Sequence, residues 1–326
     1  MKVLITGGAG FLGQRLARKL LEQGALHLAG VRWPIHQIDL LDVVAAPDCN
    51  DPRVRPVVGD IADPQVLRAA IDQDTAVIFH LAAVVSGQAE ADFDLGMRIN
   101  LDASRALLEA CRAAGHMPRV VFTSSVAVYG GALPETVLDD TALNPQSSYG
   151  TQKAIAELLL ADYTRRGFVD GRVLRLPTIS VRPGRPNAAA SSFASGIIRE
   201  PLGGEAANCP VAPGTRLWLL SPRRAVDALV AGCELDATAI GERRPINLPG
   251  VSVSAGDMVQ ALREVAGDAV ADRVSWQRDD KIERIVGSWP GRWDTRRAEQ
   301  LGLQGDGDFA SIVRAYIADD LTPAKP

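Results

Sequence analysis

The stretch "ITGGAGFLG", Ile5 to Gly13, decides the fold. It begins within a short apolar run, Val3 to Thr6, that is typical of a buried strand. Its last residues begin a segment whose apolar residues recur at helical spacing. Gly7, Gly10 and Gly13 allow a tight turn that brings backbone N–H groups and a helix N-terminus up to a pyrophosphate. The stretch therefore predicts the strand, turn and helix of a dinucleotide-binding unit.

Short apolar runs alternate with helical patterns up to about residue 177. The predicted strands are 3–6, 54–58, 77–81, 120–123 and 172–176, and the predicted helices are 11–23, 65–71, 92–114 and 149–165. Continuous apolar strands between helices are typical of a parallel sheet that is covered on both faces. The sequence thus predicts an α/β protein in which residues 1–180 form an NAD-binding, doubly wound parallel sheet, the Rossmann fold.

After Pro177 the chain becomes rich in Pro, Gly, Ala and Ser, and the regular alternation is lost. Helical patterns remain near 222–233, 254–266 and 308–318, with short strands near 216–220 and 245–248. We expect residues 181–326 to form mainly a smaller substrate-binding part that is interleaved with the main sheet, to which the chain returns near 216–248.

Composition limits the kinds of partner. Of 326 residues, 35 are Lys or Arg and 39 are Asp or Glu, with no long run of either sign, so we expect a small-molecule ligand and neither nucleic acid nor membrane. Cys49, Cys111, Cys209 and Cys233 form no C-x-x-C pair, which argues against a metal site and favours buried or idle thiols. No signal peptide and no apolar stretch of ~18 residues is present, which predicts a cytoplasmic protein.

The residue that binds the adenine ribose has two possible positions. The usual spacing after the glycine turn falls on "LHLAGVRW", near Arg32, which would favour NADP. The segment "HQIDLLDVVAAP" is the better strand and ends near Asp42, whose carboxylate would favour NAD. We therefore interpret 25–36 as an enlarged loop, Asp42 as the ribose ligand and NAD as the cofactor.

Other positions along the strand ends can contact the cofactor. Asp60 is suited to the adenine edge or, equally, to a turn or helix cap, and His80 is expected to be a packed histidine. Small residues after His80 would let the cofactor pass close to the backbone. The further predicted cofactor contacts in these loops are Phe11, Leu12, Ile61, Leu81, Ala82 and Ala83.

A serine, a tyrosine and a lysine form the predicted catalytic group. The strand in "VVFTSSVAVYGG" ends at Ser125, and "SSYGTQK" begins a helix in which Tyr149 and Lys153 lie four residues apart, on one face. A nearby ammonium and a positive nicotinamide ring would lower the pKa of the phenol and make it a general base. Alone, such a pair is commonplace; after a glycine turn and a serine strand, it indicates catalysis.

The assembled motifs resemble the extended short-chain dehydrogenase/reductases, the NAD-dependent epimerase/dehydratase group. The resemblance rests on "TGGAGFLG", "GDIAD", "HLAA", "SSVAVYG", "SSYGTQK" and Asn100 and covers nearly the whole chain. It implies that Ser125, Tyr149 and Lys153 are catalytic, that Lys153 also binds the nicotinamide ribose, and that Asn100 supports the lysine. It further implies that Pro177 and Thr178 lie against the nicotinamide, and that the helices bearing Asn100 and Tyr149 pair two subunits in a homodimer.

The segments "HLAAVVSGQAEADFDLGMRIN", "LPTISVRPGRPNAAASSFASGIIREPL" and "WLLSPRRAV" are similar to NAD enzymes of four-carbon sugar-acid catabolism within this group. Few aromatics and many small residues suit a short polar substrate. Arg182 is the candidate for its carboxylate, although a surface arginine in a Pro/Gly loop is an equal alternative. Ser86, in the loop after the fourth strand, and Ser192 are candidates for hydroxyl contacts, beside Ser125 and Tyr149.

The predicted reaction is NAD-dependent oxidation of the C2 hydroxyl of a short sugar acid. A nucleotide-sugar 4-epimerase or a uronate dehydrogenase of the same group is the alternative within this fold. Val126 stands where dehydratases carry an acidic residue, which disfavours dehydration. A non-enzymatic NAD-binding sensor is a further alternative, but it would be expected to lose Ser125, Tyr149 or Lys153.

Overall fold

The protein is described by a computed structural model over residues 1–47, 50–184 and 189–321, so that Cys49 lies outside the described residues. The strands are β1 (Lys2–Thr6), β2 (Ala25–Leu28), β3 (Val31–Pro34), β4 (Gln37–Asp42), β5 (Val54–Val58), β6 (Thr75–His80), β7 (Arg119–Ser125), β8 (Asp170–Leu176), β9 (Thr178–Ile179), β10 (Ala207–Cys209), β11 (Arg216–Leu220), β12 (Pro245–Asn247), β13 (Val251–Ser254) and β14 (Val274–Trp276).

The α-helices are α1 (Phe11–Gln23), α2 (Pro64–Ala70), α3 (Ser86–Ala91), α4 (Phe93–Gly96), α5 (Ala103–Ala114), α6 (Ser148–Arg165), α7 (Phe193–Leu202), α8 (Pro222–Glu234), α9 (Ala237–Ile240), α10 (Ala255–Ala266), α11 (Asp268–Ala271), α12 (Asp280–Gly287), α13 (Arg296–Gln300) and α14 (Phe309–Asp319). A π-helical segment, η1 (Met97–Asp102), and two 3₁₀ turns, η2 (Val126–Val128) and η3 (Ala190–Ser192), complete the secondary structure.

Seven parallel strands form the central sheet, in the order β12-β8-β7-β6-β1-β4-β5. From β1 the chain first moves to β4 and β5 on one side, then crosses to β6, β7 and β8 on the other. The order therefore reverses beside β1, and such a reversal leaves a crevice at the carboxyl ends of the strands. The predicted doubly wound Rossmann fold is confirmed.

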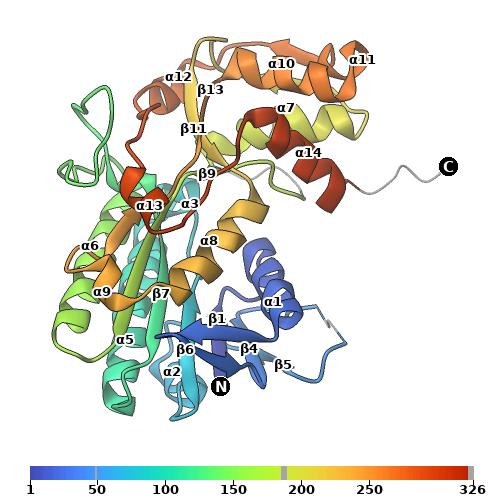
Figure 1. The fold of residues 1–326 in the computed structure, drawn as a ribbon. Helices are drawn as coiled ribbons and strands as arrows, with labels where there is room; N and C mark the ends of the chain where they lie inside the picture. Colours follow the sequence, from blue (N-terminus) through green and yellow to red (C-terminus); the bar gives the residue numbers. More distant parts are fainter. Residues whose placement is uncertain (48–49, 185–188, 322–326) are drawn as a thin grey trace.

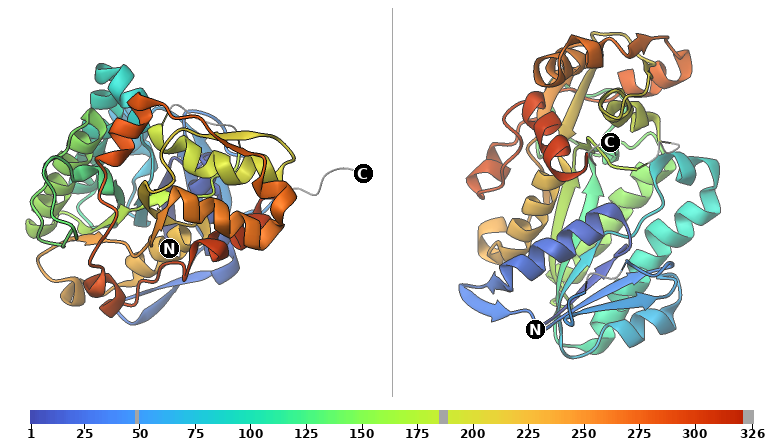
Figure 2. Two further views of the ribbon diagram at one scale, coloured as in Figure 1. Left: turned by 90° about the horizontal axis from the view of Figure 1, so that it is seen from above. Right: turned by 90° about the vertical axis from the view of Figure 1, so that its right-hand side faces the viewer.

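Helices cover both faces of the sheet (Figures 1 and 2). Successive side chains of a strand point to opposite faces. Accordingly, Val3 and Ile5 pack in a cluster with Leu16 of α1 and Leu229 of α8. Leu4 packs in the other cluster, whose helical members come from α2, α5 and α6. This arrangement makes the strand ends, rather than the faces, the accessible part of the sheet.

The predicted loop at 25–36 is wrong in one respect, because it contains a β-hairpin. Strands β2 and β3 pair antiparallel outside the central sheet, with Leu26 opposite Trp33. The turn has Ala29 and Gly30 at φ values of 50° and 76°, which match the right-handed twist of a two-residue hairpin. Strand β4 still enters the sheet next to β1, so Asp42 ends the second strand of the nucleotide-binding unit.

The predicted helix over 92–114 is divided. A short helix, α4, runs into the π-helical η1, and regular α-helix resumes as α5. Such wide turns inside helices occur often at functional sites. Here the wide turn contains Asn100, which is 1% exposed.

A smaller part, mainly after residue 181, lies beyond the carboxyl ends of the strands (Figure 1). Its core joins Ile197 of α7, Leu219 of β11, Leu262 of α10 and Ile312 of α14. Strand β11 lies in a separate sheet with β9 and β13, whereas β12 returns to the central sheet. Among the described residues, no helix is both long and apolar enough to cross a membrane.

Candidate active site

A cavity of about 660 Å³ lies at the carboxyl ends of the central strands, beneath the smaller part. It brings together most of the side chains that the sequence singled out. They are Gly7, Gly10, Phe11, Leu12, Gly13, Asp42, Asp60, Ile61, Leu81, Ala82, Ala83, Ser86, Ser125, Tyr149, Lys153, Pro177, Thr178 and Arg182. Asn100 and Ser192 do not line it; Ser192 borders a second cavity, in the smaller part.

The glycine turn leaves room for a phosphate. Gly7 has φ of 72°, and a Cβ there would stand 2.9 Å from the backbone N of Ala82. Gly10 precedes α1 as its N-cap residue, and no side chain caps the helix. Because the first N–H groups of a helix lack partners within it, this uncapped end suits the pyrophosphate of a dinucleotide.

Asp42 lines the same cavity and contacts the glycine turn. Its Oδ2 accepts a hydrogen bond from the N–H of Ala9 at 3.0 Å, and its Oδ1 accepts one from Val43 at 2.8 Å. Asp60 has both of its expected uses available: its Oδ1 accepts from the N–H of Ala62 at 2.8 Å, while Oδ2 pairs with Arg98 at 2.6 Å. Both carboxylates thus lie on the cavity at fixed positions.

His80 is a packed histidine, as expected. Its Nδ1 lies 2.7 Å from Thr6 Oγ1 and its Nε2 lies 3.0 Å from Ser104 Oγ, which donates to the carbonyl of Asn100 at 2.7 Å. Burial, and then the charge of Lys153, lowers the pKa of His80 to about 3. The ring is therefore neutral and connects β1 to the π-helical segment.

Asn100 fastens the loop after β6 to helix α6. Its Oδ1 accepts from the N–H of Val84 at 2.8 Å, and its Nδ2 donates to the Val84 carbonyl at 3.1 Å and to Gln152 Oε1 at 2.8 Å. These bonds are one residue away from Lys153 along α6. Asn100 therefore holds two segments of the cavity wall together without lining the cavity itself. The sequence alone did not indicate Val84 and Gln152 as its partners.

The start of helix α6 places Tyr149 close to Ser125. Ser147 caps the helix by accepting a hydrogen bond from the N–H of Gly150 at 3.1 Å. A Cβ on Gly150 would stand only 2.1 Å from the carbonyl oxygen of Ala127, so glycine lets the helix touch the turn that follows Ser125. The hydroxyl of Tyr149 is consequently within hydrogen-bond reach of Ser125.

The electrostatics of Tyr149 differ from the expectation. Burial raises the pKa of Tyr149 to about 12, and the hydrogen bond with Ser125 and the charge of Arg182 act in the opposite direction. Lys153, the expected cation, points its Nζ to the carbonyl of Thr123 at 2.9 Å and lies 5.7 Å from the centre of the tyrosine ring. Of the described cations, Arg182 is the one that favours the phenolate.

Arg182 is no surface arginine. It lines the cavity, and burial, together with the neighbouring charge of Arg199, lowers its pKa. Its Nη2 lies 3.4 Å from Ser191 Oγ, and no carboxylate among the described residues forms an ion pair with it. A half-buried guanidinium that lines a cavity and has no carboxylate partner among the described residues can bind an anion through two parallel hydrogen bonds.

Two of the weaker sequence predictions need correction or completion. Ser86 is the first residue of α3 rather than a loop residue, although it does line the cavity. Ser191, next to the predicted Ser192, is the serine that faces Arg182. The doublet "SS" in a loop of small residues gave no means to choose between them.

This fold and cavity define a nucleotide-dependent enzyme of the short-chain dehydrogenase/reductase type. The chain belongs to the NAD dependent epimerase/dehydratase family, whose model matches residues 3–218. It is 70% identical over 319 residues to the D-erythronate dehydrogenase of Cupriavidus necator, with 98% of each chain covered. It is 48% identical over 323 residues to the enzyme of the same name from Haemophilus influenzae, with 98% and 100% covered.

Among solved structures, the nucleoside-diphosphate-sugar epimerase from Agrobacterium tumefaciens is similar, with 43% identity and a TM-score of 0.92. The comparison covers 98% of this chain and 94% of that one. The predicted family and NAD as the cofactor are confirmed, and the chain is an NAD-dependent dehydrogenase.

Proposed function

We propose that this enzyme oxidises the C2 hydroxyl of D-erythronate to give 2-keto-D-erythronate. The observation that carries the proposal is the half-buried guanidinium of Arg182, which lines the cavity with Tyr149 and has no ion pair with a carboxylate among the described residues. Two relatives that the chain matches over nearly its full length, at 70% and 48% identity, are named D-erythronate dehydrogenase. A short sugar acid carries a carboxylate for Arg182 and, close to it, a hydroxyl for Tyr149.

The position of Arg182 supports an acid with its carboxylate next to the reacting carbon. Arg182 and Tyr149 line the same cavity, and the charge of Arg182 acts to lower the pKa of the Tyr149 phenol. A guanidinium can hold a carboxylate through two parallel hydrogen bonds. A substrate held in this way would present its C2 hydroxyl, and not a more distant one, to Tyr149.

The chain's own groups then move the proton. Tyr149 takes the proton of the C2 hydroxyl, and Ser125, bonded to Tyr149, holds the substrate oxygen as the carbonyl forms. Lys153, whose Nζ donates to the carbonyl of Thr123, holds the nicotinamide ribose. NAD, when bound, accepts the hydride from C2. The other proposed cofactor contacts lie where a dinucleotide would run, from the glycine turn and Asp42 to Pro177 and Thr178.

Nucleotide-sugar epimerisation is the second candidate, because the similar structure from Agrobacterium tumefaciens bears that name. A nucleotide sugar carries its anionic diphosphate far from the sugar carbon that reacts at C4. The uncompensated cation in this cavity lies beside the catalytic tyrosine instead. This placement favours the short acid.

A substrate screen separates the two candidates. We expect D-erythronate to reduce NAD, with L-threonate and uronic acids much poorer and UDP-glucose inactive, as measured by NADH absorbance and by product analysis. Interconversion of UDP-glucose and UDP-galactose without net NADH, and no reaction with the acids, would refute the dehydrogenase reaction proposed here.

Asp42 is proposed to select NAD. We expect Asp42→Asn to raise the KM for NAD by about 10- to 100-fold, because a hydrogen bond to a charged acceptor is lost, and to improve the use of NADP. The amide keeps an oxygen for the N–H of Ala9, which limits damage to the turn. Steady-state kinetics with both cofactors test this, and unchanged constants for both would assign the ribose to another residue.

We propose that α6 also forms a homodimer interface. Leu158 and Ile155 lie three residues apart on α6 and are 68% and 37% exposed, while Phe93 of the neighbouring α4 is 58% exposed. Leu158→Glu is expected to raise the dimer dissociation constant at least about 100-fold, measured by analytical ultracentrifugation. Trp33→Glu, at an apolar position on the hairpin that is 48% exposed, is the control and should leave the dimer intact.

A further inference from the structure

A buried polar network follows Lys153 along α6, and its two charged members lie outside the lining of the cavity. Its centre is Glu157, one helical turn after Lys153 on α6 and 1% exposed. Its partner is Arg175 of β8, which is 5% exposed. Neither side chain reaches the cavity, so neither can touch substrate or cofactor.

The carboxylate of Glu157 is held from several sides. Arg175 donates from Nε to Oε1 at 2.9 Å and from Nη2 to Oε2 at 2.6 Å, and Ser124 Oγ donates to Oε1 as well. The Nη1 of Arg175 donates to the hydroxyl of Tyr129, which in turn donates to Asn247 Oδ1 at 3.1 Å. The network thus ties α6 to β7, β8 and β12.

A buried ion pair needs a reason, because the desolvation of its two charges can exceed their attraction. Lys153 provides one. Its ammonium is 1% exposed, and burial lowers its pKa to about 8, against the opposing effect of Glu157. Glu157 lies at the i+4 position and therefore on the same side of the helix as Lys153.

Among the described residues, Glu157 is the one carboxylate that acts to raise the pKa of Lys153. His80 of β6 is neutral, and Tyr149 is a protonated phenol. Glu90 of α3 accepts from the N–H of Ser148 at the surface, and Glu109 of α5 accepts from the hydroxyl of Tyr163 near the other end of α6. Glu157 is therefore the acidic group that favours the charged lysine.

We propose that Glu157, fixed by Arg175 and Ser124, is a positioning residue that keeps Lys153 protonated and fixes the end of β7 that carries Ser125. The inference rests on the proposed function for the use that is made of Lys153. The lysine that is proposed to hold the nicotinamide ribose then depends on a carboxylate that does not line the cavity.

The test is the titration of Lys153 itself. The chain has five lysines, so in protein labelled with ¹³C-lysine the Cε resonance of Lys153 can be assigned by comparison with Lys153→Gln. We expect the midpoint of the wild type near the pKa of about 8. In Glu157→Gln it should fall by about one unit or more, because the negative charge that favours the ammonium is gone while Arg175 remains.

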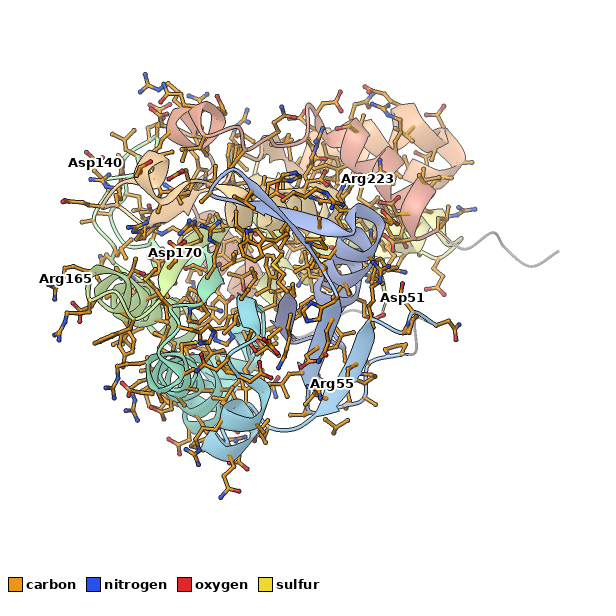
Figure 3. All side chains as sticks on the ribbon, turned by 60° about the horizontal axis from the view of Figure 1, so that its bottom comes forward. Asp51, Arg55, Asp140, Arg165, Asp170 and Arg223 are labelled. Atoms are coloured by element: carbon orange, nitrogen blue, oxygen red, sulfur yellow. The ribbon has the colours of Figure 1, made fainter. Side chains whose placement is uncertain are left out.

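The pH dependence of kcat/KM should shift in the same direction as the Lys153 midpoint. A lysine that loses its proton at lower pH should move the alkaline limb of kcat/KM to lower pH by the same amount. The matched control is Asp162→Asn, which removes the carboxylate of an exposed ion pair on the same helix. The partner of Asp162 in that pair is Arg165, which is labelled in Figure 3. Asp162→Asn should shift neither value.

Two further variants test the inference even if Glu157→Gln is unstable. Glu157→Asp retains the charge and should restore the midpoint toward that of the wild type. Glu157→Gln can be paired with Arg175→Met if the single variant folds poorly because Arg175 is left unpaired. The double variant removes both charges and should fold better. Its Lys153 midpoint should lie between those of the single variant and the wild type. Wild-type midpoints in all folded variants would overturn the inference and leave Glu157 with a structural role alone.

Failure of the two proposals can be told apart. The titration needs neither substrate nor cofactor. If the wild type does not oxidise D-erythronate but the Lys153 midpoint still moves in Glu157→Gln, the proposed function fails and the coupling of Glu157 to Lys153 stands.

Discussion

Replacement of Tyr149 by Phe is expected to lower kcat/KM for D-erythronate by about 10³- to 10⁴-fold, near the upper range for loss of a general base. The phenylalanine ring keeps the packing against the cavity wall but removes the hydroxyl that bonds to Ser125. The dissociation constant of NADH, measured by fluorescence titration, should change little, because the glycine turn, Asp42 and Lys153 remain in place.

The control for this variant is a second tyrosine of α6. Tyr163 donates its hydroxyl to Glu109, away from the cavity, so Tyr163→Phe should keep the activity of the wild type. A Tyr149→Phe enzyme that loses NADH binding as severely as turnover would show that Tyr149 holds the cofactor rather than transferring the proton.

Replacement of Arg182 by Met is expected to lower kcat/KM for D-erythronate by about 10²- to 10³-fold, as expected for loss of a charged, bidentate contact. NADH binding should be unaffected. Arg182→Lys keeps the charge without the fork and should lie between Met and the wild type. Erythritol, which lacks the carboxylate, should be a poor substrate for the wild type and should lose little further in Arg182→Met.

The melting temperature of Arg182→Met is an independent test of the role of Arg182. Arg182 is a half-buried cation without an acidic partner among the described residues, so its removal should leave the melting temperature unchanged or raise it. Arg223→Met is the control, since Arg223 pairs with Asp319 at 2.6 Å on the surface (Figure 3), and its kinetics should match the wild type. A large loss of stability in Arg182→Met, with normal kinetics, would assign Arg182 a structural role.

The sequence predicted the parallel sheet, and it singled out Ser125, Tyr149 and Lys153, which line one cavity, because both signals are encoded locally. The run from Val3 to Thr6 and the glycines after it specify a strand, a turn and a helix within about twenty residues, and the four-residue spacing of Tyr149 and Lys153 fixes their shared face. The hairpin at 25–36 escaped prediction because Ala29 occupies a turn position with positive φ, where Asn, Asp or Gly is the usual signal.

The electrostatics could not be predicted, because they depend on contacts between distant segments. Arg182 reaches the cavity through packing against Ser191 and Ser195, and nothing in "VRPGRPN" tells a buried arginine from an exposed one. The direction of the Lys153 ammonium, toward Thr123, and its link to Glu157 likewise arise only when α6 docks on β7 and β8.

The fate of the hydrogen at C2 tests the central proposal most directly. D-erythronate carrying deuterium at C2 should transfer it to NAD, so that mass spectrometry finds one deuterium in the reduced cofactor and none in the 2-keto acid, with a slower rate in single turnover. Reduced cofactor without deuterium, formed while the label stays in the acid, would show that another carbon is oxidised and would contradict the geometry proposed for Arg182 and Tyr149.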